Sequence, residues 1–352
     1  MSIFGTRPEI IRLSLVFKEL EKKGFEHVMV YTDQNYDKNL SEIFFKELGI
    51  RKPDYNLRMS GTSYGQMVGD IIAKSDEVIV RERPDILLVL GDTNSGLSVI
   101  SAAHRGVKIA HIEAGMRSYD RRMPEEKNRV IIDHLSSVLF PYTEYSRQNL
   151  LRENIAPNKI YVIGNPIVDV IEHFRDRFEK STILEKMHLQ KKDYFLVTAH
   201  RSENVDDEET LRNIFKGLKK VHNKFGSRIV YPMHPRTMSK IGKLQIPKAI
   251  QIIKPLGFFD FTKLEKHALC LITDSGTVQE EGLYFKVPCV TIRKSTERPE
   301  TVEIGSNIIA GLSPDNILAS VDAALKTNPN WNYTLGDGRS SVRVVNVLRG
   351  AF

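Results

Sequence analysis

The run ILLVL at residues 86–90, followed directly by GDTNS at 91–95, decides the class of fold. Consecutive apolar residues of this kind predict a strand that is covered on both faces, as the strands of parallel sheets are. An expected helix at about 95–105 and a second apolar run, VKIAHI at 107–112, complete a β-α-β unit. The region therefore predicts an α/β fold whose parallel sheet carries polar residues at the carboxyl ends of its strands.

The same alternation continues in both directions along the chain. Toward the N-terminus it predicts strands at about 1–5 and 27–32, separated and followed by helices near 8–23, 37–48 and 63–81. A second series of strands, each followed by a polar turn and an amphipathic helix, is expected at 160–163, 194–198, 228–233 and 268–273.

Two such series predict two Rossmann-like domains that face each other across a cleft. A chain of 352 residues is long enough for two domains that each bury a core. We place the N-terminal domain at 1–165 and the C-terminal domain at 166–338, and we expect the helix in 339–352 to pack back on the first domain. Ligands of open α/β sheets bind beyond the carboxyl ends of the strands, so the residues after each apolar run are the candidates for function.

Composition excludes several classes of protein. The net charge of +7 comes from Lys and Arg residues that are mixed with acids along the chain, so we expect no nucleic-acid partner. No apolar run approaches the roughly 20 residues that cross a bilayer, and the first residues lack the pattern of a signal peptide, so we expect no membrane partner and a cytoplasmic location. Cys270 and Cys289 lie in apolar runs, which predicts buried free thiols.

Sequence motifs for common cofactors do not occur. There is no GxGxxG turn, Walker loop, HExxH or cysteine–histidine cluster, so we expect no redox cofactor, no ATP and no bound metal.

Acids and arginines follow the strands of the first half. GTRPE at 5–9 places Arg7 beside a helix start, where it either meets an anion or is a solvated arginine next to a helix cap. Asp92 after the strand at 86–90 is either a site carboxylate or a cap. In HIEAGMR at 111–117 we expect two small residues to pass close to a ligand while Glu113 and Arg117 point outward.

A further pair of acids opens the helix that starts in MPEEKNR at 123–129. Acids are favoured there by the helix dipole alone, but Glu125 is also placed to join Asp92 in one cleft. Repulsion between clustered carboxylates raises their pKa values toward those that serve proton transfer.

The second half supplies cations and a candidate diphosphate site. In TAHRSEN at 198–204, His200 beside Arg201 suits a phosphate or a proton transfer, and His234 in HPRT at 234–237 either repeats this theme or is a satisfied loop residue. TDSGTVQEE at 273–281 breaks a strand into Ser-Gly and starts a helix, whose free amides and the Ser275 hydroxyl suit a diphosphate. Glu281, further along that helix, is within reach of ribose hydroxyls.

These motifs, together with STERPE at 295–300, resemble in order and spacing those of the non-hydrolysing UDP-N-acetylglucosamine 2-epimerase family. The resemblance spans nearly the whole chain. It implies a GT-B-like fold, a homodimer, and UDP held mainly by the C-terminal domain. It also implies conversion of UDP-GlcNAc to UDP-ManNAc without NAD: the enzyme eliminates UDP to give a 2-acetamidoglucal and adds it back with the opposite configuration at C2.

The resemblance also implies roles for residues at matching positions. Asp92, Glu113 and Glu125 resemble the catalytic carboxylates of the family, and His200 resembles the histidine that helps the diphosphate to leave. Arg12 stands where many members have lysine, which keeps the charge and changes the geometry. The predicted substrate-binding residues are Arg7, Arg12, Arg129, Arg201, His234, Phe261, Ser275, Gly276, Thr277, Glu281 and Arg298, with Phe261 on the uracil side and Ser275, Gly276 and Thr277 in the diphosphate turn.

Departures from the family pattern leave the substrate open. AHRSENV at 199–205 and HPRT at 234–237 look more like the branch that epimerises UDP-linked 6-deoxy-L-talosamine derivatives to UDP-N-acetyl-L-fucosamine. DQNYDKN at 33–39 replaces a run that is linked in bacterial members to regulatory UDP-GlcNAc binding. Three alternatives remain beside the epimerase: a retaining glycosyltransferase, a hydrolysing epimerase, and a sugar-nucleotide sensor that has lost its chemistry.

Overall fold

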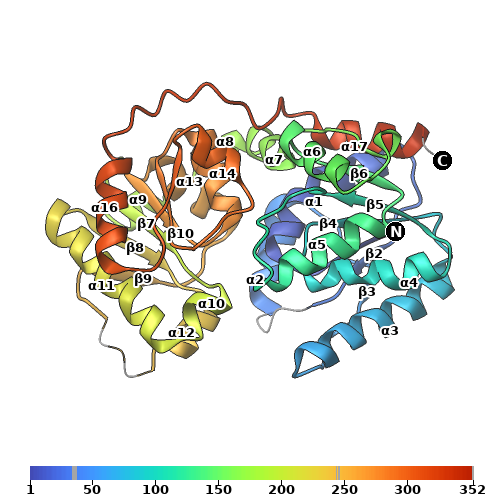
Figure 1. The fold of residues 1–352 in the computed structure, drawn as a ribbon, viewed down its shortest axis with the longest axis horizontal. Coiled ribbons are helices and arrows are strands. Elements are labelled where there is room, and N and C mark those ends of the chain that lie inside the picture. Colours follow the sequence, from blue (N-terminus) through green and yellow to red (C-terminus); the bar gives the residue numbers. More distant parts are fainter. Residues whose placement is uncertain (34–37, 243, 245, 351–352) are drawn as a thin grey trace. The chain divides into compact units, whose positions relative to one another are not determined.

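The computed structural model describes residues 1–33, 38–242, 244 and 246–350. The chain forms two compact units, Met1–Phe174 together with Leu335–Phe352 (unit 1), and Arg175–Thr334 (unit 2). Figure 1 shows a sheet flanked by helices in each unit. The two predicted Rossmann-like α/β domains are therefore confirmed as a fold class, and the boundaries at 165 and 338 stay predictions.

Unit 1 contains a six-stranded parallel sheet in the order β3-β2-β1-β4-β5-β6. The central strands β1 and β4 are neighbours in the sheet although they are far apart in the chain, which makes their carboxyl ends the switch point where ligands of such sheets bind. The strands are β1 (Ser2–Phe4), β2 (Met29–Tyr31), β3 (Tyr55–Asn56), β4 (Ile86–Leu90), β5 (Lys108–Ile112) and β6 (Val138–Phe140).

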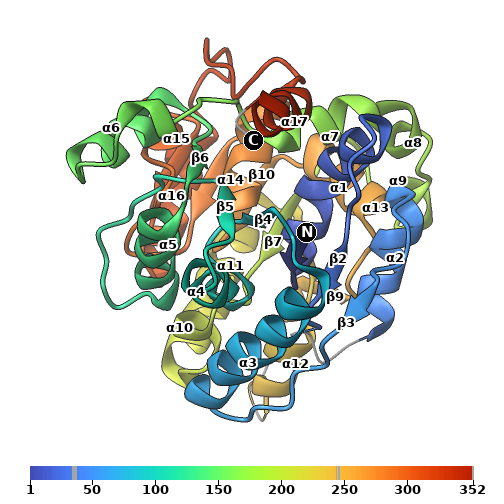
Figure 2. The same cartoon turned by 90° about the vertical axis from the view of Figure 1, so that its right-hand side faces the viewer.

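Helices cover both faces of this sheet (Figure 2). Alternate strand residues point to opposite faces, so Ile3, Leu87 and Ile109 join a core with Val78 of α3, while Phe4 packs on Phe17 of α1 on the other face. The helices are α1 (Arg7–Lys22), α2 (Lys38–Leu48), α3 (Tyr64–Glu82), η1 (Asn94–Ser98), α4 (Val99–His104), α5 (Pro124–Leu135), α6 (Glu144–Arg152), η2 (Pro157–Lys159), α7 (Pro166–His173) and α17 (Ser340–Gly350).

The C-terminal helix α17 belongs to unit 1, where it packs on α1 and α7. The backbone amides of Ser340 and Ser341 donate to the carboxylate of Asp169 at 3.1 and 2.7 Å. Asp169 thus satisfies two of the free amides at the start of α17 and joins this helix to α7.

Unit 2 contains a second six-stranded parallel sheet in the order β12-β11-β10-β7-β8-β9. Here β7 and β10 form the central pair. The strands are β7 (Tyr194–Thr198), β8 (Arg228–Pro232), β9 (Ile250–Ile253), β10 (Cys270–Thr273), β11 (Cys289–Thr291) and β12 (Asn307–Ile309), and the helices are α8 (Arg175–Glu179), α9 (Ile183–Lys186), α10 (Ser202–Val205), α11 (Glu208–Phe225), α12 (Pro235–Lys240), α13 (Phe258–His267), α14 (Gly276–Phe285), α15 (Pro299–Glu303) and α16 (Pro314–Ala324).

Two cores lie on the two faces of this sheet. Phe195 and Val197 of β7 join α11 and α16 in one core, and Tyr194 and Leu196 join α13 and α14 in the other. Cys270 and Cys289 are free and buried, as predicted.

The predicted strand at 160–163 is wrong. This segment donates one backbone hydrogen bond to β6, from Tyr161 to Leu139, and one to the residue after β6, from Ile163 to Pro141, but forms only an isolated bridge. Tyr161 and Val162 are exposed, at 38% and 40%. The apolar run therefore lies along the edge of the sheet without becoming a strand.

Candidate functional site

The predicted carboxylates of unit 1 lie at the switch point of its sheet. Asp92 follows β4 and Glu113 follows β5, and these two strands are paired along their whole length. A Cβ on Gly91 would lie 3.5 Å from Glu113 Oε1, so the Glu113 carboxyl group contacts the turn that carries Asp92. Glu113 has a backbone φ of +73°, a left-handed conformation that costs energy in a residue other than glycine. Such strain is concentrated at functional sites.

Each of these two carboxylates forms an ion pair with a buried arginine. Arg12 pairs with Glu113, and Arg129 pairs with Asp92. Both arginines are 2% exposed, and Arg12 also lies 5.6 Å from the ring centre of Tyr142. The expected cluster of carboxylates that repel one another is therefore not what the structure contains: the acids are held in place by cations.

Of the two acids in the first turn of α5, Glu126 holds the neighbouring loop and an arginine in place, a role that the sequence did not predict. It pairs with Arg129 and accepts hydrogen bonds from the backbone amides of Ser118 and Tyr119. Glu125 is partly buried in the same turn. Its catalytic role stays a prediction.

A buried network lies behind this edge of the sheet. His111 Nδ1 lies 2.7 Å from Asp133 Oδ1, and His111 Nε2 lies 2.9 Å from the carbonyl oxygen of Gly91. Because both partners accept hydrogen bonds, each ring nitrogen of His111 is placed to donate one. Burial alone raises the pKa of Asp133, but hydrogen bonds and charge from His111 and Arg117 outweigh it and hold that pKa below its usual value.

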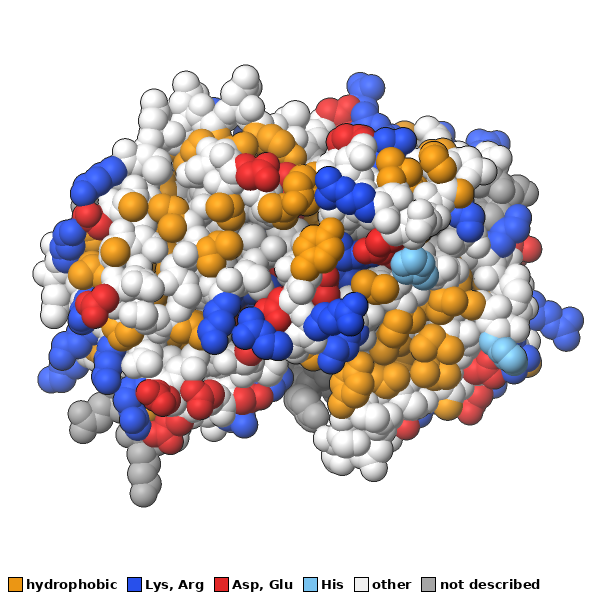
Figure 3. Space-filling view, in the orientation of Figure 1, with side chains coloured by type: hydrophobic (Ala, Val, Ile, Leu, Met, Phe, Trp, Pro, Cys, Tyr) orange, Lys and Arg blue, Asp and Glu red, His pale blue; other side chains and the backbone are white. Residues whose placement is uncertain are grey.

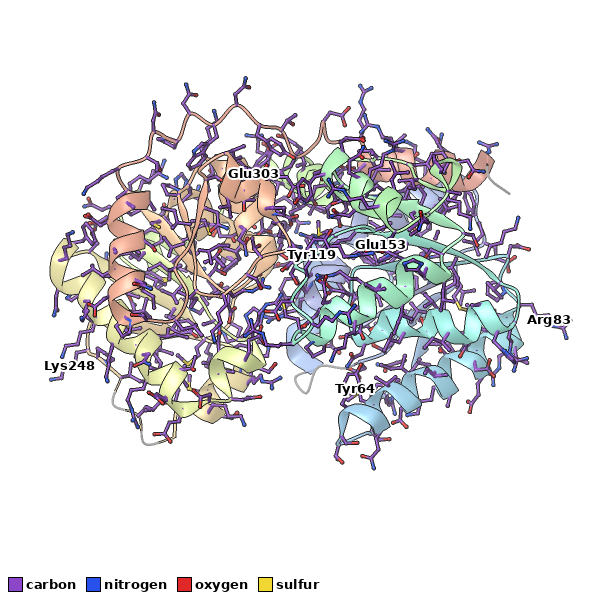
Figure 4. All side chains as sticks on the ribbon, viewed as in Figure 1. Tyr64, Arg83, Tyr119, Glu153, Lys248 and Glu303 are labelled. Atoms are coloured by element: carbon purple, nitrogen blue, oxygen red, sulfur yellow. The ribbon has the colours of Figure 1, made fainter. Side chains whose placement is uncertain are left out.

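Arg117 belongs to this network, so the prediction that it points outward is wrong. It is 3% exposed and pairs with Asp133 at 2.7 Å. It also donates two hydrogen bonds of 2.7 Å to Glu153, which Figure 4 labels. Arg117 therefore neutralises the buried Asp133 and the partly exposed Glu153 behind the site and is not placed to meet a ligand.

Packing against a neighbouring helix requires glycine at position 115. Its φ is +78°, and a Cβ there would overlap the carbonyl oxygen of Ser146 in α6. The Gly115 amide donates to Asp133 at 3.1 Å. The expected close approach of this turn to a ligand stays a prediction.

The backbone of the turn after β1 forms a helix cap, which was one of the two alternatives for this turn. The amides of Gly5 and Thr6 donate to Glu9 Oε2 at 3.2 and 2.8 Å, so they satisfy the first turn of α1. Burial raises the pKa of Glu9 to about 7, against the effect of its hydrogen bonds. Arg7 is partly exposed beside this turn, and its contact with an anion stays a prediction.

In unit 2, Asp274 organises the loop that carries His200. Its Oδ2 accepts from the backbone amides of His200 and Arg201, both at 2.9 Å, and from Asn204 Nδ2 at 3.1 Å. His200 Nδ1 lies 3.5 Å from Asp274 Oδ1, and the His200 side chain is 41% exposed. A fully buried carboxylate thus fixes the loop and presents an accessible imidazole.

His234 lies close to His200, with ring centres 5.7 Å apart. Its Nδ1 accepts from the Arg236 amide at 3.2 Å and caps α12. The Nδ1 atom of His234 is therefore satisfied within its own loop, which was one of the two alternatives for this residue. A contact between the rest of the ring and the substrate stays a prediction.

The predicted diphosphate turn starts a ten-residue helix, α14, with Ser275 as its N-cap. A Cβ on Gly276 would overlap the Arg298 guanidinium, so that cation packs directly on the turn. Arg201 Nε donates to the carbonyl oxygen of Asp274 at 3.0 Å, just before Ser275. Helix amides with Thr277 in the first turn and two arginines beside them suit an anion.

Glu281 lies further along α14 and is 5% exposed. Phe261 of α13 is half-buried against the core on that face of the sheet. Their contacts with ribose and uracil stay predictions. Among the residues that the structure describes, no group of His, Cys, Asp and Glu is arranged to hold a metal ion, and no helix in that part of the chain is long and apolar enough to cross a membrane.

Only part of the segment at 33–39 lies within the described residues, so regulation there stays untested. Sequence reasoning also missed Asp133, Asp274 and Glu126. No local motif marks Asp133, whereas Glu126 and Asp274 each stand in a motif, MPEEKNR at 123–129 and TDSGTVQEE at 273–281, without having been assigned a role.

Comparisons with known proteins agree with this geometry. The sequence profile of the family described as UDP-N-acetylglucosamine 2-epimerase matches residues 18–349. The chain is 44% identical to a UDP-N-acetylglucosamine 2-epimerase of Methanococcus maripaludis, over 99% of this chain and 97% of the relative. It is 38% identical to a UDP-2,3-diacetamido-2,3-dideoxy-D-glucuronate 2-epimerase of Pseudomonas aeruginosa, over 99% and 98% of the two chains. The crystal structure of Methanocaldococcus jannaschii UDP-GlcNAc 2-epimerase in complex with UDP-GlcNAc and UDP matches with a TM-score of 0.95 at 42% identity, over 99% of each chain.

Proposed function

Since this chain belongs to the UDP-N-acetylglucosamine 2-epimerase family, an isomerase family, we propose that it is a non-hydrolysing 2-epimerase that converts UDP-GlcNAc to UDP-ManNAc. The observation that carries the proposal is the pair Asp92 and Glu113 at one switch point, each held by a buried arginine. The named activity of the relatives supports the same substrate.

The reaction proceeds by elimination and re-addition. A base in unit 1 removes the proton from C2, the C1–C2 double bond forms, and the C1–O bond breaks so that UDP leaves with the bonding electrons. UDP then adds back to C1 while a proton returns to the opposite face of C2. A sugar C2–H is weakly acidic, so a positioned base and charge stabilisation of the leaving group must act together, each contributing several kcal/mol at most.

The groups of unit 2 suit the leaving group. The amides at the start of α14 and the side chains of Arg201 and Arg298 would bind the diphosphate, and His200 would assist its departure. Glu281 would accept hydrogen bonds from the ribose, and Phe261 would contact the uracil.

Product analysis tests the proposal. Purified enzyme incubated with UDP-GlcNAc should give UDP-ManNAc at equilibrium without accumulation of free UDP or free sugar. Release of UDP with free N-acetylmannosamine would instead identify a hydrolysing enzyme, transfer only in the presence of an acceptor would identify a glycosyltransferase, and saturable UDP binding without any turnover would identify a sensor.

Two variants assign the chemistry to unit 1. Glu113→Gln and Asp92→Asn should each lower kcat about 10²- to 10⁴-fold, as loss of a general acid or base does, while UDP binding stays within a few-fold of the original. Glu209→Gln is a matched control because Glu209 is an exposed acid of unit 2. Full activity in both unit 1 variants would remove these carboxylates from the mechanism.

A second substrate class has specific support. The P. aeruginosa relative is named for a UDP-linked sugar other than UDP-GlcNAc, so relatives of this chain include 2-epimerases named for another substrate. The runs at 199–205 and 234–237 resemble the branch that makes UDP-N-acetyl-L-fucosamine. We therefore propose the UDP-linked 6-deoxy-L-talosamine derivative as the alternative substrate. Turnover of it without turnover of UDP-GlcNAc would keep the mechanism and change the substrate.

We further propose that the enzyme is a homodimer through the outer surface of α4 and α5. Hydrophobic side chains gather over this part of unit 1 (Figure 3). Ile100, Ile131 and Leu135 are 36%, 40% and 38% exposed there, and contiguous apolar surface of this kind marks association. Light scattering should give twice the chain mass, and Ile131→Glu should give the monomer. The cytoplasmic location stays a prediction.

A further inference from the structure

A buried carboxyl group that no predicted role uses, Glu265, faces the carboxyl group of Glu281. Glu265 lies in the last turn of α13 and is completely buried, and Glu281 on the neighbouring helix α14 is 5% exposed. Apart from the Glu281 carboxyl group, no described residue hydrogen-bonds with either oxygen of Glu265. Burial, then the charge of Glu281 and a hydrogen bond with it, hold the pKa of Glu265 well above its usual range.

Two ionised carboxylates cannot hydrogen-bond, because both only accept. One proton shared between them makes one a carboxylic acid that donates to the other, and it removes most of the repulsion. Among the described residues, Glu281 is the charged group that acts on Glu265, and no cation does so. Glu265 acts electrostatically on the neutral side chains of Tyr194 and Cys289, and the Tyr194 hydroxyl already donates to the Leu264 carbonyl at 2.6 Å.

We propose that Glu265 is a positioning residue: as a carboxylic acid it donates to Glu281 and fixes that carboxylate so that it accepts hydrogen bonds from the ribose hydroxyls of UDP. The inference rests on the proposed function, because only there is Glu281 the group that binds the ribose. A cation in place of Glu265 would neutralise Glu281 and weaken its hold on hydroxyl donors, whereas a neutral acid orients the carboxylate and leaves its charge intact. The neighbouring acid Glu280 shows the contrast, since its Oε1 lies 3.3 Å from Arg298 Nε.

Comparing the binding of two ligands, with and without ribose hydroxyls, separates the orientation of Glu281 by Glu265 from a merely structural role of Glu265. Calorimetry would measure the Kd of UDP and of 2′,3′-dideoxy-UDP, which lacks both hydroxyls, for the full-length protein and three variants. Glu265→Gln keeps a neutral donor, Glu265→Met keeps the length of the side chain without a donor, and Glu303→Gln is a control at an exposed acid of unit 2.

The original protein, Glu265→Gln and Glu303→Gln should bind UDP at least about tenfold more tightly than the dideoxy ligand, and in Glu265→Met this ratio should fall about tenfold toward one, as loss of a hydrogen bond to a charged group implies. A loss of folding stability would weaken both ligands equally and leave the ratio unchanged. If Glu265→Met folds and keeps the same ratio of the two Kd values as the original protein, the inference is overturned.

If Glu265→Met does not fold, infrared spectroscopy tests the proposal without that variant. Infrared difference spectra between the original protein and Glu265→Gln should contain the C=O band of a protonated carboxylic acid, and absence of the band would overturn the proposal. Equal binding of UDP and dideoxy-UDP by the original protein would overturn it too, while the epimerase proposal would still stand on its product. If the original protein neither binds UDP nor turns over substrate, the proposed function itself fails, and the inference fails with it.

Discussion

The buried carboxyl group of Glu9 should make unit 1 lose stability as the pH rises toward 7. The pKa of Glu9 is raised from 4.5 to about 7 in the folded chain, so the fold favours the protonated form. A raised carboxyl pKa contributes stability that is fully present below about pH 4.5 and is lost as the pH rises through about 7. The full difference corresponds to about 3 kcal/mol, and about 2 kcal/mol of it should disappear between about pH 5.5 and pH 8.

Glu9→Gln tests this magnitude. The amide oxygen of glutamine can still accept from the Gly5 and Thr6 amides, and its NH₂ group is a neutral donor toward the hydroxyls of Thr6 and Thr93, which contribute to the pKa of Glu9.

Urea denaturation at the two pH values would be followed for the original chain, Glu9→Gln, and Glu26→Gln as a control at an exposed acid. All other titrating groups are shared, so the difference in pH dependence belongs to residue 9. The original chain and the control should lose about 2 kcal/mol more than Glu9→Gln. Equal pH dependence in all three would refute the reasoning.

Three further substitutions test the geometry behind the candidate residues of unit 1 and of unit 2. Gly115→Ala should cost more than about 2 kcal/mol and lower Tm clearly, because a Cβ would overlap Ser146 and the backbone is left-handed; an unchanged Tm would contradict this. Asp133→Asn should cost about 3–5 kcal/mol in denaturant unfolding, since it leaves His111 and Arg117 without their shared anion; a loss below about 1 kcal/mol would show that the network is not charged as argued. His234→Ala should remove the cap of α12 at a cost of about 1 kcal/mol, and equal stability of His234→Asn, which can still cap, is the check.

The sequence was sufficient for the strands that are buried on both faces. Runs such as 86–90 are apolar throughout because helices cover both sides of the sheet, and the turn residues that follow them, Asp92 and Glu113, lie together because parallel strands end at one edge. The run at 160–163 has the same composition but lies along the sheet edge, where only context decides whether a ladder forms.

Local sequence patterns could not predict the groups that support the site. Asp133 stands on the inner face of α5, and its partners His111 and Arg117 come from a strand and a loop that the chain reaches earlier. Glu125 and Glu126 are adjacent acids that differ by one helical step, and only the packing of α5 shows that Glu126 binds the loop at 118–119. Glu265 is a buried acid of α13 that no motif marks, and its role depends on Glu281 of another helix.

The central claim is that the chain exchanges the C2 proton of a UDP-linked N-acetylhexosamine. Proton NMR of the purified enzyme with UDP-GlcNAc in deuterium oxide measures this directly. We expect the C2 proton signal to disappear as the signals of UDP-ManNAc deuterated at C2 grow, and Glu113→Gln to suppress both changes together. Epimer formation with the C2 proton retained would contradict elimination and re-addition, and so would the absence of exchange with both UDP-GlcNAc and the 6-deoxy-L-talosamine substrate.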